Sequence, residues 1–108
     1  MTINSKQKGK RGELSVAHIL QEHGFTDARR TAQYCGNTGD ASDVVGIAGF
    51  HIEVKRSEKT EIWKWLNQAN SDAKEDEIPI VVFRRNRAKW QVCLDFETFL
   101  DLLKNQGD

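Results

Sequence analysis

The sequence predicts a single α/β domain, built as a mixed β-sheet flanked by helices. At 108 residues the chain is long enough for one hydrophobic core, and 38% hydrophobic with 30% charged residues is a globular balance. The spacing of apolar residues along the chain predicts helices and strands in the order αβββαββα. A helix that crosses between two strands of one sheet leaves those strands parallel, so we expect a mixed sheet rather than a purely antiparallel one.

The first half of the chain is expected to form one helix and three strands. A basic tail at residues 1–8 precedes an apolar pattern of helical period at 9–23, and a short strand follows near 29–33. The glycine-rich stretch CGNTGDAS is a loop by composition, and VVGIA, apolar on both faces, predicts a central and doubly buried strand over 43–48. From 50 to 55 apolar and polar residues alternate, as in a strand with one apolar and one polar face.

The second half is expected to supply the crossover helix, a hairpin and a last helix. An apolar stripe of helical period predicts a helix over 59–75. Next come IPIVVF, a strand at 78–83, the polar turn RRNRAK, and WQVCL, a paired strand at 90–94. Asp95 is a residue type favoured at helix N-termini, so we expect it to cap the final helix.

Two classes of protein are not expected from the composition. No apolar run approaches the roughly 20 residues that cross a bilayer, and the polar N-terminus lacks the apolar segment of a secretory signal. We therefore expect a cytoplasmic protein with no membrane partner. Cys35 and Cys93 stand far apart and neither has a second cysteine nearby, which predicts reduced thiols rather than a disulfide framework or a zinc site.

The charges balance in number but not in place. The chain has 16 basic and 16 acidic residues, so its net charge of zero says nothing about nucleic acid. The basic residues nevertheless gather in three short stretches, which would give a basic face suited to phosphate. Scattered, solvated charges are the alternative, and it stays open. The candidate phosphate contacts are Lys8, Lys10, Arg11, Arg29, Arg30, Arg84, Arg85 and Arg87.

Asp43, Glu53 and Lys55 form the candidate reactive group. If the strand that Asp43 opens meets the polar face of the next strand, the two carboxylates come together, and Mg²⁺ takes oxygen ligands of this kind. A bound divalent ion with a lysine beside it suits phosphodiester hydrolysis. The alternative is ordinary: Glu53 and Lys55 face solvent, and Asp43 caps a loop. His51 shares the same strand face, and a packed, a solvated and a functional role all remain open for it.

These residues resemble the PD-(D/E)xK nuclease signature, and within it the chain is similar to archaeal, Hjc-like Holliday junction resolvases. The resemblance covers nearly the whole chain. KGKRGE at 8–13 matches the KGxxxE of the family's first helix, and the glycine-rich loop, the Asp, the ExK and a helix with Gln68 follow in order. Ser42 stands where the signature has a proline, a position that donates no ligand. The resemblance implies one nuclease domain over 1–108 with a restriction-endonuclease-like core.

The resemblance also implies roles for the matched residues. Lys55 would be the catalytic lysine, and Thr38 in the loop would touch phosphate. Glu13 as a plain first-turn acid and Gln68 as a plain helix residue are the alternatives. The implied catalytic set is Glu13, Asp43, Glu53, Lys55 and Gln68. The implied metal ligands are Asp43, Glu53, the backbone carbonyl of Val54, and Glu13.

The expected function is therefore that of a Mg²⁺-dependent DNA endonuclease, with Mn²⁺ as a substitute ion, acting on branched DNA such as a four-way junction. The resolvases that it resembles act as homodimers, so we expect a homodimer here. One rival is another nuclease of the same superfamily, VRR-NUC-like, flap-cutting or duplex-nicking. A second rival is a non-catalytic DNA-binding module on the same fold. Trp63 lies off the apolar stripe of its helix and is a candidate for an exposed partner surface.

Overall fold

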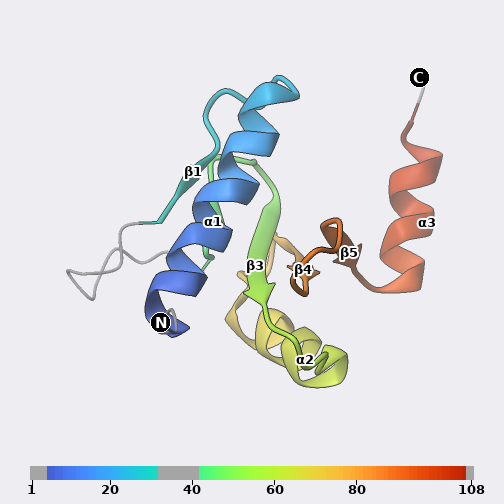
Figure 1. The fold of residues 1–108 in the computed structure, drawn as a ribbon. Coiled ribbons are helices and arrows are strands. Elements are labelled where there is room, and N and C mark those ends of the chain that lie inside the picture. The colour runs from blue at the N-terminus through green and yellow to red at the C-terminus, as the bar shows by residue number, and fades with distance from the viewer. Residues whose placement is uncertain (1–4, 32–41, 107–108) are drawn as a thin grey trace.

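The computed structural model describes residues 5–31 and 42–106, and its elements follow the expected order (Figure 1). The α/β fold with a mixed sheet, as in a restriction-endonuclease-like core, is confirmed. The elements are α1 (Ser5–Glu22), β1 (Arg29–Arg30), β2 (Val44–Val45), β3 (Phe50–Arg56), α2 (Ile62–Asp72), β4 (Ile78–Arg84), β5 (Gln91–Cys93) and α3 (Phe96–Lys104).

In the described part of the chain the sheet has five strands, in the order β1-β2-β3-β4-β5. Among them, strands that are joined by turns or loops pair antiparallel, whereas β3 and β4 run parallel because α2 carries the chain back between them. This confirms the expected crossover. In the parallel pair Glu53 lies opposite Val81, and Arg56 lies opposite Arg84. The middle strand, β3, carries most of the residues that matter below.

The helices α1 and α2 cover opposite faces of the sheet. Alternate residues of β3, Ile52 and Val54, pack against α1, which Figure 1 shows lying along β3. The residues between them share the face of Val81, where α2 packs Trp65 and Ala69. Each face thus has its own small hydrophobic cluster, and burial of these clusters is the main force that closes the fold.

One strand differs from its prediction. The stretch at 43–48 was expected to be the central strand, but β2 ends at Val45 and β3 takes the centre. The cause is Gly46, which has φ of +99° and lies so close to the backbone of Asp27 that a Cβ would stand 2.0 Å from its carbonyl oxygen. The chain turns there instead of continuing as a strand, because a left-handed residue does not extend a ladder.

Several boundaries also differ. The first helix begins at Ser5, so residues 5–8, expected in the tail, are helical. The second helix spans Ile62–Asp72 and is shorter than the expected 59–75. The continuation of β1 to residue 33 and the thiol of Cys35 lie outside the described residues, whereas Cys93 is a free thiol as expected.

The last helix, α3, stands apart from the rest in Figure 1. Asp95 caps it as predicted, since its carboxylate accepts a hydrogen bond of 3.2 Å from the backbone N–H of Thr98. None of its residues is buried, although its apolar side chains share one face. Among the described residues no helix has both the length and the apolar character needed to span a membrane.

A substitution pair tests the role of Gly46. We expect Gly46→Ala to lower the free energy of unfolding by about 3 kcal/mol or more, because the new Cβ meets the Asp27 backbone as well as an unfavourable φ. Gly49 also has a positive φ, of +84°, but open space around it, so Gly49→Ala should cost only about 1 kcal/mol. Urea unfolding measures both, and equal losses would show that the contact with Asp27 has no part in ending β2.

Candidate active site

The polar face of β3 is buried, not wet. His51 and Glu53 are only 1% and 2% exposed, while Lys55, nearer the end of the strand, remains partly exposed. A buried carboxylate is costly unless charges or hydrogen bonds compensate it. The alternative of a solvent-facing Glu53 is therefore wrong. The groups around Glu53 must explain how its buried carboxylate is stabilised.

Strand pairing brings Asp43 beside Glu53. The backbone N–H of Asp43 donates to the carbonyl of Ile52 at 2.8 Å, and the N–H of Val54 donates to the Asp43 Oδ2 at the same distance. The Asp43 side chain also lies within hydrogen-bonding reach of Glu53. Asp43 is thus held in line with β3 by main-chain contacts on both sides. The structure brings together the two carboxylates that the sequence analysis paired.

The two carboxylates are crowded. Burial raises the pKa of Asp43 to about 7, with further contributions from the negative charges of Glu53 and, more weakly, Glu13, against the opposing hydrogen bond from Val54. The negative charges around Asp43 are therefore not fully balanced by positive groups nearby. Oxygen donors that repel one another at one spot are the chemistry that a hard divalent cation relieves, so the residues present fit such an ion.

Glu13 reaches the same place from α1. Its side chain is mostly buried and its carboxylate forms an ion pair with the Arg30 Nε at 2.8 Å. Burial raises the pKa of Glu13, Arg30 opposes the rise, and the charge of Glu53 adds to it. Lys55 also acts on it electrostatically. Glu13 therefore belongs to the acidic group, and its local partner is Arg30.

Lys55 lies on the same face of β3, one pleat beyond Glu53. Its Nζ donates to the Oε1 of Gln68, on α2, at 2.8 Å. Both residues that the sequence analysis placed at the site are therefore in contact. The amide oxygen holds the ammonium group without neutralising it, so the lysine keeps a positive charge to offer to a ligand.

His51 is the residue whose role the sequence left open. A hydrogen bond of 2.8 Å joins its Nδ1 to the Ser42 Oγ, and one of 2.7 Å joins its Nε2 to the Glu53 Oε1. Burial alone would lower the pKa of His51, but the bond to Glu53 and the charges of Glu53, Glu77 and Asp72 raise it overall. His51 thus fixes the orientation of Glu53. The alternation of polar and apolar residues along the strand correctly predicted that His51 shares a face with Glu53, but it did not predict that His51 is buried.

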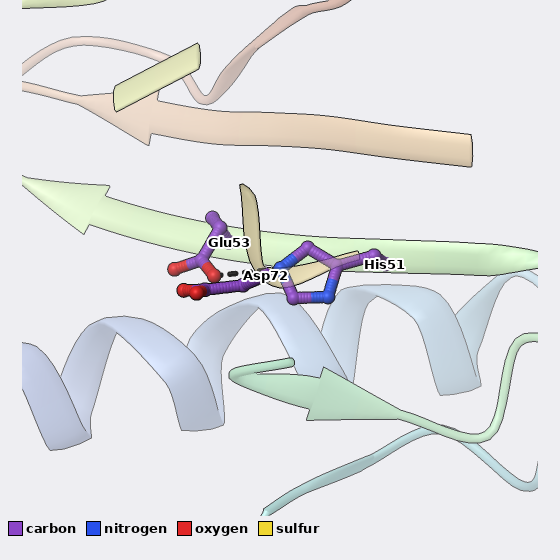
Figure 2. Close-up of side chains that lie close together, drawn as sticks. All are labelled: His51, Glu53 and Asp72. Atoms are coloured by element: carbon purple, nitrogen blue, oxygen red, sulfur yellow. Dashed lines mark hydrogen bonds and ion pairs between the residues drawn. The ribbon is translucent and has the colours of Figure 1, made fainter. Parts of the chain in front are cut away.

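A second group of potential ligands shares Glu53. His51, Glu53 and Asp72 each offer one atom, and these atoms lie within 4.8 Å of one another; Figure 2 shows the three side chains converging. Asp72 comes from the end of α2 and is exposed. With an imidazole nitrogen, this group suits Mn²⁺ or Zn²⁺ better than Mg²⁺. Asp72 was missed from sequence because only the fold brings the end of α2 to β3.

The described candidate phosphate contacts come from α1, β1, β4 and the turn after β4. Arg30 is engaged by Glu13, and Arg29 lines a cavity of about 510 Å³ with Asp27, Asp72 and Lys74. Thr38 lies outside the described residues. The remaining candidates are on the first turns of α1 or on β4 and the turn that follows it: Lys8, Lys10, Arg11, Arg84, Arg85 and Arg87.

Comparison with known proteins places the chain in a family. A family model described as "Phage putative PDDEXK endonuclease" matches residues 4–107, which is almost the full chain. No curated protein and no solved structure matches it. The match agrees with the PD-(D/E)xK signature but gives no support to the archaeal, Hjc-like type in particular.

The crowding at Asp43 predicts how stability depends on pH. The folded protein holds the Asp43 proton more tightly than the unfolded chain, whose ordinary pKa is 3.8, so stability is lost as pH rises from that value to about 7. Asp43→Asn keeps an oxygen for the Val54 N–H and removes the charge. In chelator-treated buffer we expect it to raise the free energy of unfolding by about 4 kcal/mol at pH 8 and hardly at all at pH 4, since the interval from 3.8 to about 7 spans about three pH units of about 1.4 kcal/mol each.

The control for this prediction is Asp76→Asn, at an exposed position outside the site, which should change stability little at either pH. Urea unfolding across the pH range gives the result. A variant Asp43→Asn that loses as much stability at pH 8 as at pH 4 would contradict the proposed crowding of charge.

Proposed function

We propose that this chain, which belongs to the phage putative PDDEXK endonuclease family, hydrolyses phosphodiester bonds of DNA at the group formed by Asp43, Glu53 and Lys55. One observation carries the proposal. The partly buried carboxylate of Asp43 lies within hydrogen-bonding reach of the buried carboxylate of Glu53, and a lysine follows on the same face of β3. A partly buried acid with a perturbed pKa and charged neighbours, as Asp43 is, is typical of functional sites.

The cofactor that we assign to the site is Mg²⁺, with Mn²⁺ as a substitute. Asp43 and Glu53 would hold it, with the backbone carbonyl of Val54 and Glu13 as further ligands, and the raised pKa of Asp43 supports a cation there. Such an ion polarises a phosphoryl oxygen and makes a water molecule more acidic. The His51, Glu53 and Asp72 group is the rival location.

The remaining residues prepare the site for a phosphate. Gln68 holds the Lys55 ammonium near the exposed end of β3, where it can balance the negative charge that builds on a phosphate during attack. His51, fixed by Ser42, keeps Glu53 in one orientation. Arg30 does the same for Glu13. These contacts position the reacting groups before any ligand arrives, which lowers the cost of ordering them.

The substrate that we propose is branched DNA, in particular a four-way junction. Support comes from the order of motifs shared with the Hjc-like resolvases, from KGKRGE at 8–13 to Gln68, and from basic residues on α1 and after β4. Another nuclease of the PD-(D/E)xK superfamily, flap-cutting, VRR-NUC-like or duplex-nicking, is the first rival. A DNA-binding module without catalysis is the rival of a different class.

Cleavage assays separate these alternatives. Labelled four-way junction, flap and linear duplex are incubated with the protein in Mg²⁺, in Mn²⁺ and in chelator. We expect junction cleavage that needs the metal, and a loss of rate of about 100-fold or more in Asp43→Ala and Lys55→Ala, because each removes a group acting on the transition state. Preference for linear duplex would favour the rival nucleases.

Two control variants sharpen the assay. Lys59→Ala removes a lysine that is 83% exposed and should leave the rate unchanged. Asp72→Asn should also leave it unchanged if the metal lies between Asp43 and Glu53, whereas a loss as large as that of Asp43→Ala would move the metal to the group with His51. Activity that survives both Asp43→Ala and Lys55→Ala would mean that a contaminating nuclease cleaves the DNA. The chain would then be interpreted as a DNA-binding module without catalysis.

We also propose that the chain forms a homodimer through α3. The apolar side of α3 is exposed, with Phe96 70% and Leu103 48% accessible, and Trp63 nearby in α2 is 80% accessible, as the sequence predicted. A groove of about 230 Å³ lies beside the start of α3, lined by Trp63, Leu66, Leu94 and Phe96. An apolar helix face and an apolar groove on one chain are complementary, which is what a two-fold dimer requires.

Sedimentation tests the dimer. Phe99→Glu and Leu103→Glu place charges on the apolar side of α3, so we expect the wild-type dimer to become a monomer at micromolar concentrations. Lys104→Glu, on the same helix but already polar, should remain a dimer. A wild-type protein that is monomeric throughout the range would contradict this part of the proposal.

A further inference from the structure

Two arginines lie side by side on the sheet face that α1 covers. The parallel strands β3 and β4 end in Arg56 and Arg84, which are opposite one another in the register. Arg56 alternates with Lys55, so it points to the face away from the carboxylates. Both side chains are partly buried, which strengthens the repulsion between two positive groups placed next to each other.

Neither arginine has an acidic partner in the described part of the chain. Ion pairs there involve Glu13, Glu53 and Glu61, and none of them reaches either guanidinium. Arg56 makes only a long contact of 3.5 Å from its Nη2 to the Asn86 Oδ1, and Arg84 donates from its Nη1 to the Ala88 carbonyl at 3.2 Å. Their Nε atoms are buried without an acceptor. Unpaired buried N–H groups are unfavourable, so an acceptor that reached either Nε atom would stabilise that side chain.

Arg84 nevertheless packs against an aromatic ring that contacts α1. The guanidinium of Arg84 lies over the ring of Trp90 at 5.2 Å from its centroid, and the Trp90 Nε1 donates to the Ser15 Oγ on α1. The helix α1 packs closely here: a Cβ at Gly12 would stand at ordinary contact distance, 3.4 Å from Trp90 and 3.5 Å from the Cβ of Arg56. The basic first turns of α1 therefore lie at the same end of the sheet as the two arginines.

We propose that Arg56 and Arg84 together bind one phosphate group of the DNA backbone. A phosphate between them would offset the repulsion between the two guanidinium groups and accept hydrogen bonds from their Nη atoms. If the guanidinium groups rotate toward it, its oxygens would also accept hydrogen bonds from the two Nε atoms. This phosphate is a different one from the phosphate that is cleaved, because Arg56 and Lys55 point to opposite faces of β3. The identification of DNA as its source rests on the proposed function.

The first experiment uses inorganic phosphate alone, without DNA or metal. Thermal unfolding is followed in low salt and in phosphate at an ionic strength matched with chloride. We expect phosphate to raise the Tm of the wild-type protein and of Lys64→Gln, a control that removes an exposed lysine. Arg56→Gln should lose this rise while its Tm without phosphate stays equal or increases, because one of the two repelling charges is gone.

A purely structural role for Arg56 predicts the reverse: Arg56→Gln lowers the Tm without phosphate, and the rise with phosphate persists. That result, or a wild-type protein that does not respond to phosphate, overturns the proposal. Arg56→Lys is the second variant, since it retains the charge and the aliphatic stem and so the packing against α1. We expect it to fold and to lose most of the rise, because lysine lacks the planar fork.

The second experiment measures DNA binding in chelator, where no cleavage occurs. Each phosphate contact contributes about 0.9 to the slope of log Kd against log salt concentration, so Arg56→Gln should reduce the slope by about that amount, equally for junction and duplex. An unchanged slope together with a lost phosphate response would assign the site to free phosphate and contradict the DNA contact. If the chain binds DNA through Arg56 but does not cleave it, the proposed nuclease function fails and this inference stands.

Discussion

The candidate site depends on the hydrogen bond between the Val54 N–H and the Asp43 carboxylate. It fixes an acid that precedes one strand against the backbone of the next, and so holds the partly buried Asp43 beside the buried Glu53, where their negative charges repel each other. Thr31, at the end of β1, supports this arrangement from the other side by donating its N–H to the Asp43 carbonyl and its hydroxyl to the Ser42 carbonyl. The crowded acids therefore result from main-chain geometry, which substitutions of surface residues leave in place.

The middle strand serves two purposes because its side chains alternate. One face carries His51, Glu53 and Lys55 in a row of hydrogen-bonded polar groups beneath α2. The other face carries the apolar contacts to α1 and ends at Arg56. The alternation of side chains along one strand thus places Glu53 and Arg56 on opposite faces of the sheet, so Arg56 does not neutralise the carboxylates of the candidate site.

Sequence reasoning reached the order of the elements, the parallel crossover and the Asp95 cap, because these follow from periodicity and from residues within a few positions of one another. It also paired Asp43 with Glu53. It overestimated β2, since the obstacle at Gly46 is the backbone of Asp27, a contact between distant segments. The burial of His51 and the approach of Asp72 likewise depend on how α2 docks, which no local pattern encodes.

The isolation of α3 has a thermodynamic consequence. The helix has nine residues, a capped N-terminus and no buried side chain, so contacts with the rest of the chain stabilise it little beyond its own backbone hydrogen bonds and cap. It can fray and reform while the sheet stays intact, so amide exchange there reports a local equilibrium and not the global one. A partner that binds the apolar side of α3 would therefore stabilise the helix. The protection of α3 amides from exchange then measures the fraction of molecules in which this surface is covered.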